Sequence, residues 1–385
     1  MTLRRDRVFW TVSLQIAIVN IYLGGFGPAQ PLLRAEQHTS LTVAGLHGTA
    51  MGVAAILAGF ISPHLVHKFG RQITSWMGFA LFTAGVLMFV FSPPVSLTLL
   101  ATLLGGIGIS TVINTMVTQL SDHYPKDASA ALSQASGISS AGYIIGTLSV
   151  GAIASTSMSW RLGLLSVVPL ALLLYFYARP YIAKEHIPHE SGPERGAMSA
   201  QFWIAWFGFI ACISTEFATT FWAAALVKDR VGSTAAVSTL SMLAFGIGMA
   251  LGRWFGPGLL RRLNIDSKLK SVLVFQFIGF GIFWASHIMW LSLLTLLMMG
   301  SGVSMQFALS SMRLIGLSGG RPELAVGRSS LAAGIAIAAA PFLLGVFGDH
   351  LGISRAYLMV PVLIVIALGT IIAIPTESRK LEASK

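Results

Sequence analysis

Charged residues are scarce in this sequence. Asp, Glu, Lys and Arg together make up 10% of the 385 residues, whereas a soluble globular domain carries about 25% charged residues. Hydrophobic residues make up 55%, and the mean hydropathy is +0.76. The apolar stretches recur from one end of the chain to the other, which is more apolar surface than a water-soluble core can bury. The composition therefore excludes a soluble globular protein and predicts a chain that crosses a lipid bilayer many times.

Cysteine is almost absent, since Cys212 is the only one, and an intrachain disulfide is excluded. The sequence also lacks a phosphate-binding loop, a nucleotide-binding domain and a zinc spacing such as HExxH. We therefore expect no enzyme activity, no cofactor, no metal site and no ATP-driven transport by this chain alone. The net charge of +11 does not indicate nucleic-acid binding, because the basic residues lie in short loops between apolar segments.

Apolar segments long enough to span a bilayer follow one another along the chain. The first comes after the basic sequence MTLRRDR, and it is long for a signal peptide and has no clear small-residue cleavage site, so we interpret it as a retained membrane helix. The sequence predicts an all-α membrane protein with twelve transmembrane helices, at 9–32, 42–66, 72–91, 95–120, 128–152, 159–182, 202–226, 235–259, 271–291, 292–316, 326–348 and 353–375.

The distribution of Lys and Arg predicts the orientation of these helices. With the N-terminus in the cytoplasm, twenty of the 25 basic residues fall on the cytoplasmic side. The other five fall outside, and they are Arg34, Arg161, Lys228, Arg230 and Arg355. We therefore expect a multi-pass protein of the cell membrane with both termini in the cytoplasm.

The two halves of the chain look like copies of each other. A shift of 194 residues aligns Gly52 with Gly246 and Pro63 with Pro257, among further glycine and basic pairs. Because the shift spans six helices, an even number, the repeat is parallel, as in transporters whose halves rock around a central site. A polar stretch rich in Pro, Gly and charge divides the halves. We predict an N-terminal six-helix bundle at 1–182, a cytoplasmic linker at 183–201 and a C-terminal six-helix bundle at 202–385.

The loop between the second and third predicted helices reads PHLVHKFGRQ, residues 63–72. It resembles the signature loop of the major facilitator superfamily, with Pro63 and His67 standing where that family has Gly and Asp. A second copy lies at 257–264. The resemblance implies a cytoplasmic gate in which basic side chains bind the last carbonyls of neighbouring helices. Its candidate members are Lys68, Arg71, Arg261 and Arg262, and the alternative is that they only anchor the loops by the positive-inside rule.

Glu216 is the acidic residue that lies well inside a predicted helix, in the run CISTEFATTFWAAALV. A carboxylate at mid-membrane depth is costly and is by default a candidate functional group. Glu216 followed six residues later by Trp222 resembles the fucose-permease-like branch of the superfamily, which includes sugar–proton symporters. The runs GGIGISTVIN, LAFGIGMALGRWFGPGLLRR and AAPFLLGVFGDHLG also resemble that branch. We interpret Glu216 as the proton-coupling residue. Burial makes its charged form costly and so favours uptake of a proton. Glu216 could then bind a proton in one facing state and release it in the other.

The first, fourth, seventh and tenth helices line the cavity in this superfamily. The resemblance therefore implies a substrate site formed by Asn20, Tyr22, Asn114, Gln119, Glu216, Trp222, Gln306 and Arg313. The alternative for the Asn and Gln residues is that they only hydrogen-bond a neighbouring helix, as such residues often do in membrane proteins. Arg313 either snorkels to the cytoplasmic surface or pairs with Glu216. Trp222 is either a platform for a sugar ring or part of the aromatic belt. Arg253, which follows Gly252 in the eighth helix, is interpreted as structural.

These observations predict a secondary active transporter of a small polar solute, a sugar or related metabolite, that works by alternating access and is coupled to protons. We expect a monomer whose partners are the solute, H⁺ and the lipid bilayer. One alternative is a drug or metabolite exporter of the same superfamily, although Ala101 and Thr102 stand where most drug exporters have Arg. The other is a membrane sensor or accessory protein that has lost transport.

Overall fold

The computed structural model describes residues 5–124, 128–181 and 196–376 of the chain, and among them it has helices and no strand. Seven α-helices and a short 3₁₀ helix form the first half. Their bounds are α1 (Arg7–Gln37), α2 (Leu41–Phe69), α3 (Arg71–Phe91), α4 (Val95–His123), α5 (Ala128–Ala154), α6 (Arg161–Leu165), α7 (Val167–Ala178) and η1 (Arg179–Tyr181).

Eight α-helices form the second half. Their bounds are α8 (Ala200–Val231), α9 (Ala235–Leu259), α10 (Ile265–Ala285), α11 (Met289–Val303), α12 (Gln306–Gly316), α13 (Pro322–Leu351), α14 (Ile353–Ala356) and α15 (Met359–Ala373). In the described part of the chain, eleven helical segments are long and apolar enough to cross a membrane. The 25-residue helix α9 is not among the eleven, and it lies where the eighth spanning helix is predicted. The all-helical prediction is confirmed.

Three of the predicted helices are each divided into two in the structure. The sixth is α6 and α7, the tenth is α11 and α12, and the twelfth is α14 and α15. The prediction for the ninth helix is wrong at its start, because α10 begins at Ile265 and not at 271. The side chain of Asn264 caps it by accepting a hydrogen bond from the Ser267 N–H at 2.7 Å. Asp266 therefore lies in the first turn of a membrane helix and is buried.

Side-chain caps fix the start of several other helices. Asp6, Ser40, Ser199 and Thr234 each accept a hydrogen bond from the backbone N–H three residues later, at the starts of α1, α2, α8 and α9. Asp6 also accepts hydrogen bonds from Tyr124 and the His123 ring at the end of α4. This contact ties the start of α1 to the end of α4.

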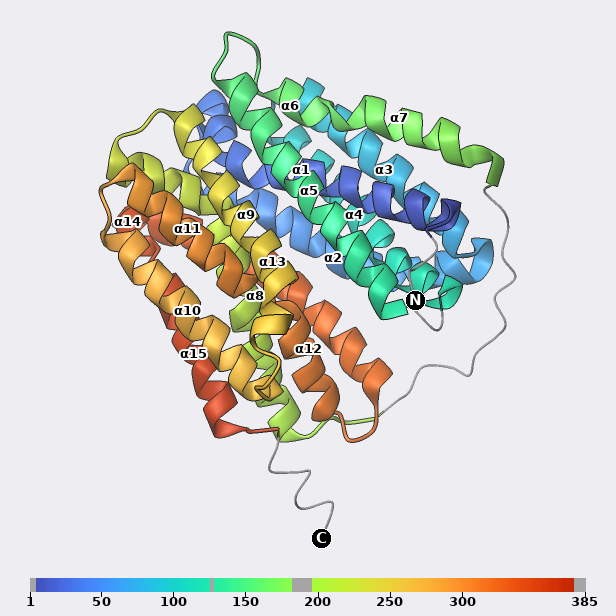
Figure 1. The fold of residues 1–385 in the computed structure, drawn as a ribbon. Helices are drawn as coiled ribbons and strands as arrows, with labels where there is room; N and C mark the ends of the chain where they lie inside the picture. Colours follow the sequence, from blue (N-terminus) through green and yellow to red (C-terminus); the bar gives the residue numbers. More distant parts are fainter. Residues whose placement is uncertain (1–4, 125–127, 182–195, 377–385) are drawn as a thin grey trace.

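The helices form two bundles that lie side by side (Figure 1). Helices α1–α7 pack mainly against one another, and helices α8–α15 do the same. The bundles meet along two main seams, α2 against α13 and α5 against α9, and α1 also touches α8 between them. Figure 1 shows the bundles converging at the upper left and separating toward the side where α1 begins and α15 ends.

One end of the seam between α2 and α13 is tightly closed, and we call it the sealed side. A Cβ atom on Gly52 of α2 would collide with the backbone of Ala338 on α13, so the two helices touch at their backbones there. At the start of α2, the Asp349 carboxylate of α13 accepts hydrogen bonds from the N–H groups of Leu41 and Thr42, each at 2.8 Å. An acid of one bundle thus caps a helix of the other.

The opposite end of the same seam is open. Close packing between the two helices extends as far as Ile56 of α2 and Gly334 of α13. Beyond these residues a Cβ on Gly59 or on Gly327 would meet nothing within 4 Å, and Phe60 is 67% exposed. We call this end the open side. The arrangement is a two-bundle protein captured closed on one side and open on the other.

Candidate functional site

A cavity lies between the two bundles, with about 630 Å³ of empty space when the part at its open mouth is included. Helices α1, α2, α5, α8 and α9 supply its walls, so both halves of the chain contribute. Its lining residues are Asn20, Leu23, Phe26, Gly27, Met51, Ser140, Tyr143, Glu216, Phe217, Thr220, Phe221, Gly246, Met249 and Arg253.

Glycines bring α1 and α5 close enough to form one wall of this cavity. A Cβ on Gly24 of α1 would collide with the Tyr143 carbonyl, and a Cβ on Gly146 of α5 would collide with the Ile21 carbonyl. Only residues without a side chain allow backbones to approach so closely in a membrane bundle. The Thr147 hydroxyl also donates to the Gly24 carbonyl at 2.9 Å. This close crossing holds the side chain of Tyr143 at the cavity.

The polar groups of the cavity come from four helices. On α1, the Asn20 amide donates to the Ile16 carbonyl at 2.9 Å, which leaves its own oxygen available. On α5, the buried Tyr143 hydroxyl has no hydrogen-bond partner. On α9, Arg253 donates to the Ser140 hydroxyl at 3.2 Å. Polar groups that converge on a largely apolar pocket without full pairing are typical of a ligand site.

Glu216 of α8 lies among these groups. It is half-buried, and its exposed part faces the cavity. Among the residues that the structure describes, it forms no hydrogen bond or ion pair, and the nearby positive charge that acts on it is Arg253. One acid and one base, from different helices of the same bundle, thus share the cavity without touching.

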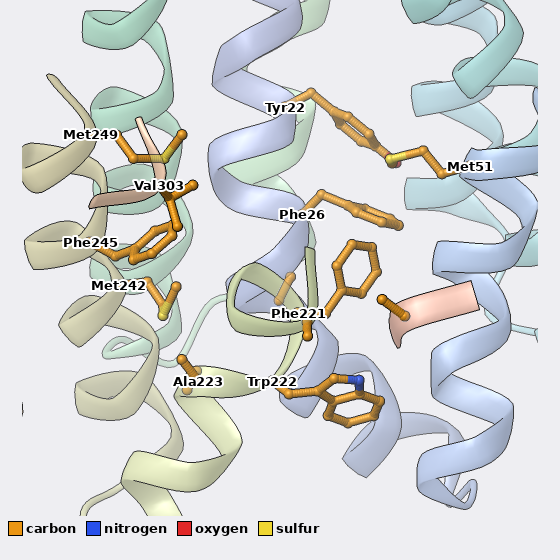
Figure 2. Packing of buried hydrophobic residues seen from close by; sticks show 14 of the residues in the cluster. Tyr22, Phe26, Met51, Phe221, Trp222, Ala223, Met242, Phe245, Met249 and Val303 are labelled. Carbon is orange, nitrogen blue, oxygen red and sulfur yellow. The ribbon is translucent and has the colours of Figure 1, made fainter. Parts of the chain in front are cut away.

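Aromatic rings close the cavity toward the sealed side. Phe26 of α1 and Phe221 of α8 come from different bundles and meet edge to face, with ring centroids 5.8 Å apart. Figure 2 shows both rings pointing the same way as Tyr22, with Met51 beside them. Tyr22 stacks on Phe26 at 5.2 Å. This packing forms an apolar floor beneath Asn20 and Glu216.

Comparison with known proteins decides the family. The model of the Major Facilitator Superfamily matches residues 12–321, which is most of the chain. The chain belongs to the Major Facilitator Superfamily. Membership makes it a membrane transporter and not an enzyme. Among the described residues, no three His, Cys, Asp or Glu side chains gather in a way that could hold a metal ion.

Solved structures of major facilitator transporters share this fold. A bacterial homologue of the human lysosomal transporter Spinster, in an inward-facing and occupied conformation, superimposes with a TM-score of 0.77 at 14% identity, covering 97% of each chain. The nucleoside transporter NupG superimposes with a TM-score of 0.79 at 11% identity, covering 96% of this chain and 100% of that one. Identities this low show the fold alone.

One curated relative is similar in sequence. Multidrug resistance protein 1 of Bacillus subtilis (strain 168) is 25% identical over 141 residues. The match covers 35% of this chain and 36% of that protein, so it spans about a third of each.

Two of the substrate-site residues predicted from the major facilitator resemblance, Asn20 and Glu216, line the cavity. Tyr22 is only 3% exposed and packs inside the first bundle, edge to face with Phe82 and Phe89. Trp222 is fully buried, and its indole N–H donates to the Pro341 carbonyl at 2.8 Å within the second bundle. Both aromatic side chains support the walls and do not face the cavity.

The fourth-helix candidates also lie outside the cavity lining. Asn114 is exposed on the surface of α4. Gln119 is buried near the end of α4, where its amide donates to the Arg71 carbonyl at the start of α3, at 3.4 Å. Gln119 makes the contact with a neighbouring helix that the alternative for membrane Asn and Gln supposes, and the exposed Asn114 does not.

The tenth-helix candidates form buried contacts within the second bundle. The Gln306 amide donates to the Gln276 side chain at 2.6 Å, and Gln276 donates to Thr215. Arg313 pairs with Asp266 at 3.0 Å and also donates to the carbonyls of Thr370 and Ile374. Arg313 therefore pairs with Asp266 and not with Glu216, because the early start of α10 brings a second acid into the bundle.

The four candidate gating residues lie at the open ends of the helices. Lys68 is exposed at the end of α2, with its ammonium 5.2 Å from the centre of the Phe69 ring. Arg71 begins α3, and Arg261 and Arg262 are exposed just beyond α9. All four lie on the side where the bundles are apart.

Sequence reasoning did not assign four polar residues of the cavity to the site: Ser140, Tyr143 and Thr220 were not named, and Arg253 was interpreted as structural. The sequence does contain a signal for Arg253, because a charged residue within an apolar helix marks a candidate functional site even when a glycine such as Gly252 precedes it. Ser140 and Tyr143 carried none, because nothing in the sequence shows which face of α5 turns toward α9. Their place depends on the glycine contacts between α1 and α5.

Proposed function

We propose that this transporter moves a small polar solute, a sugar or related metabolite, through the cavity by alternating access, with Glu216 carrying a coupled proton. The observation that carries the proposal is the unpaired Glu216 carboxyl group in a cavity between two bundles. An ionised carboxyl group is costly in so apolar a site unless a positive charge balances it, and the neutral form avoids this cost. It can therefore exchange a proton as the cavity turns from one side to the other.

The two seams support a rocking motion of the bundles. The halves touch through α2 and α13 and through α5 and α9, and they are sealed at one end and parted at the other. If each bundle of residues 1–182 and 202–385 moves as a unit, closing the open side would separate Leu41 from Asp349. With both termini in the cytoplasm, as the basic residues predict, the present state opens inward.

A drug or metabolite exporter is the second candidate. The partial similarity to a multidrug resistance protein favours it, and so do the apolar walls of the cavity, which include Leu23, Phe217 and Met249. Against it stand the neutral residues Ala101 and Thr102, where most drug exporters have an arginine. Direction of transport distinguishes the two candidates, since an exporter would take its solute from the open side.

Transport into proteoliposomes tests the proposal. Thermal stabilisation of the purified protein, screened across sugars, organic acids, nucleosides and amino acids, first identifies a solute. Wild-type protein should then concentrate this solute when a pH gradient is imposed. Glu216→Gln should lose the driven uptake and keep solute exchange, because a neutral side chain still permits rocking. The matched control is Asp229→Asn, an exposed acid at the sealed end of α8. Unchanged driven uptake by Glu216→Gln would refute the proposal.

A further inference from the structure

Arg253 is the feature of the cavity that the coupling proposal leaves unused. It lies on α9 at the open side, and its guanidinium donates a single hydrogen bond, to the Ser140 hydroxyl. A guanidinium carries five N–H donors in a planar fork that matches a carboxylate. Among the described residues no acid pairs with it, although the charge of Glu216 is near enough to interact. Arg253 is exposed and lines the cavity, so its remaining N–H donors are available to a ligand there.

The charges of the cavity depend on one proton. Among the lining residues the charged or titratable side chains that face one another are Glu216 on α8, Arg253 on α9 and Tyr143 on α5, while α1 and α2 contribute the neutral Asn20 and Met51. With Glu216 ionised, the cavity is neutral overall. With Glu216 protonated, the cavity carries one positive charge that has no counter-ion.

We propose that the solute is a monoanionic organic acid, whose carboxylate binds Arg253 and replaces Glu216 as its counter-ion when Glu216 takes up a proton. This inference rests on the proposed function and specifies its substrate class. The empty transporter then holds ionised Glu216 with Arg253, and the loaded transporter holds protonated Glu216 with Arg253 and the acid. Both states are neutral, so both can close around the cavity without burying an unbalanced charge.

The rest of the cavity fits an acid with an apolar or ring-shaped body. Phe26, Phe217, Phe221 and Met249 offer apolar contact, and the Tyr143 hydroxyl and the Asn20 oxygen offer hydrogen bonds. A phosphate monoester fits less well, because it carries between one and two negative charges near neutral pH and would leave the loaded cavity negative. A neutral sugar would leave Arg253 without a counter-ion once Glu216 is protonated.

Binding measured by isothermal titration on the full-length protein in nanodiscs tests the inference. The probes are four acids, each with a neutral partner of similar size: acetate with acetamide, benzoate with benzamide, nicotinate with nicotinamide, and gluconate with glucose. We expect at least one acid to bind and its partner to bind at least ten-fold more weakly. In wild-type protein its Kd should rise about ten-fold per pH unit once Glu216 is ionised, as linkage to one proton requires.

Two variants give the sharpest readout. Glu216→Gln fixes the cavity in its positive form, so the Kd of the acid should stop changing between pH 5 and pH 9. Arg253→Gln should weaken the acid at least ten-fold, and Arg253→Lys should restore part of the binding. Arg355→Gln, an exposed arginine of α14 outside the cavity lining, is the matched control and should bind as wild type does.

Each result separates this inference from the proposed function. The inference is overturned if none of the four acids binds, if an amide or glucose binds as tightly as its acid, or if binding survives Arg253→Gln unchanged. Uptake of a neutral solute that is driven by a pH gradient and lost in Glu216→Gln would leave the proposed function standing without the inference. An acid that binds Arg253 but whose uptake is never driven by a pH gradient would support the assigned ligand class and refute the proton coupling of the proposed function.

Discussion

The hydrogen bonds of Asp349 predict how strongly the sealed side is held closed. The carboxylate of α13 accepts the N–H groups of Leu41 and Thr42 at the start of α2, each at 2.8 Å, across the boundary between the bundles. Asp349→Asn keeps one carbonyl oxygen, which can accept one of these bonds. It replaces the other oxygen by an NH₂ group that cannot accept, and it removes the negative charge from a helix N-terminus.

The expected effect follows from these two losses. Asp349 is exposed, so water competes for it and each hydrogen bond contributes only about 1 kcal/mol. The charge at the helix N-terminus adds about 0.3–1 kcal/mol. The substitution should thus destabilise the sealed state by about 1–2 kcal/mol, which shifts the equilibrium between the two facing states about 5- to 30-fold.

Distances between two spin labels measure this shift. Labels at Thr156→Cys and Lys228→Cys lie on the sealed ends of different bundles, in a background where the buried Cys212 is replaced by Ala. Asp349→Asn should raise the population of long distances, and the control Asp229→Asn should not. Equal distance distributions in wild type and Asp349→Asn would refute the view that this contact holds the sealed side.

Three further predictions concern stability. Gly146→Ala should lower the free energy of unfolding by about 1–3 kcal/mol, because its Cβ would collide with the backbone of Ile21. The control Gly281→Ala, where a Cβ meets nothing within 4 Å, should unfold as wild type does. Equal melting points for the two variants would contradict the glycine contact. Arg313→Met should lower the free energy of unfolding by about 3–5 kcal/mol, because it leaves the buried Asp266 carboxylate without its counter-ion. The double variant with Asp266→Asn should recover part of this loss. If denaturant unfolding shows that the losses of the two single variants simply add, the pairing is contradicted. Burial alone would raise the pKa of Asp6, but hydrogen bonds from the Phe9 N–H, His123 and Tyr124 lower it. The stability lost in Asp6→Asn should therefore be fully present above about pH 4 and should decline as pH falls from there through the lowered pKa of the folded state. A stability difference between wild type and Asp6→Asn that is unchanged at pH 3 would contradict this.

The positions of the helices follow from the sequence because membrane spans need long apolar segments, whatever the fold. Local breaks do not follow. The sequence near Ser304 and Met305 reads as one continuous helix, yet α11 ends and α12 begins there. Neighbouring helices can satisfy the freed backbone groups of such a break. The start of α10 does not follow from the sequence either, because Asp266 and two lysines make the stretch before residue 271 polar. The pairing of Asp266 with Arg313 is visible only in the structure.

From the residues alone, the site was predictable only where a charge inside an apolar helix marked it, and Asn20 followed from the family resemblance. Glu216 stood out because an acid inside an apolar helix is costly. Tyr22 and Asn20 are two residues apart on α1 and so point to different faces of the helix, and the sequence does not show which face turns to the cavity. The 194-residue alignment pairs Tyr22 with Glu216, but the structure turns Asn20 to the cavity and Tyr22 into the bundle. Helix rotation, set by the glycine contacts with α5, decides between them.

We propose that a proton on Glu216 moves with the solute through this cavity. The most direct test of this coupling records the internal pH of proteoliposomes with a trapped pH-sensitive dye, while the solute is added outside with no gradient imposed. We expect the interior to acidify as the solute enters, with one proton per solute, and Glu216→Gln to exchange solute without any change of pH. Solute entry with no acidification in the wild type, or the same acidification in Glu216→Gln, would refute proton coupling through Glu216.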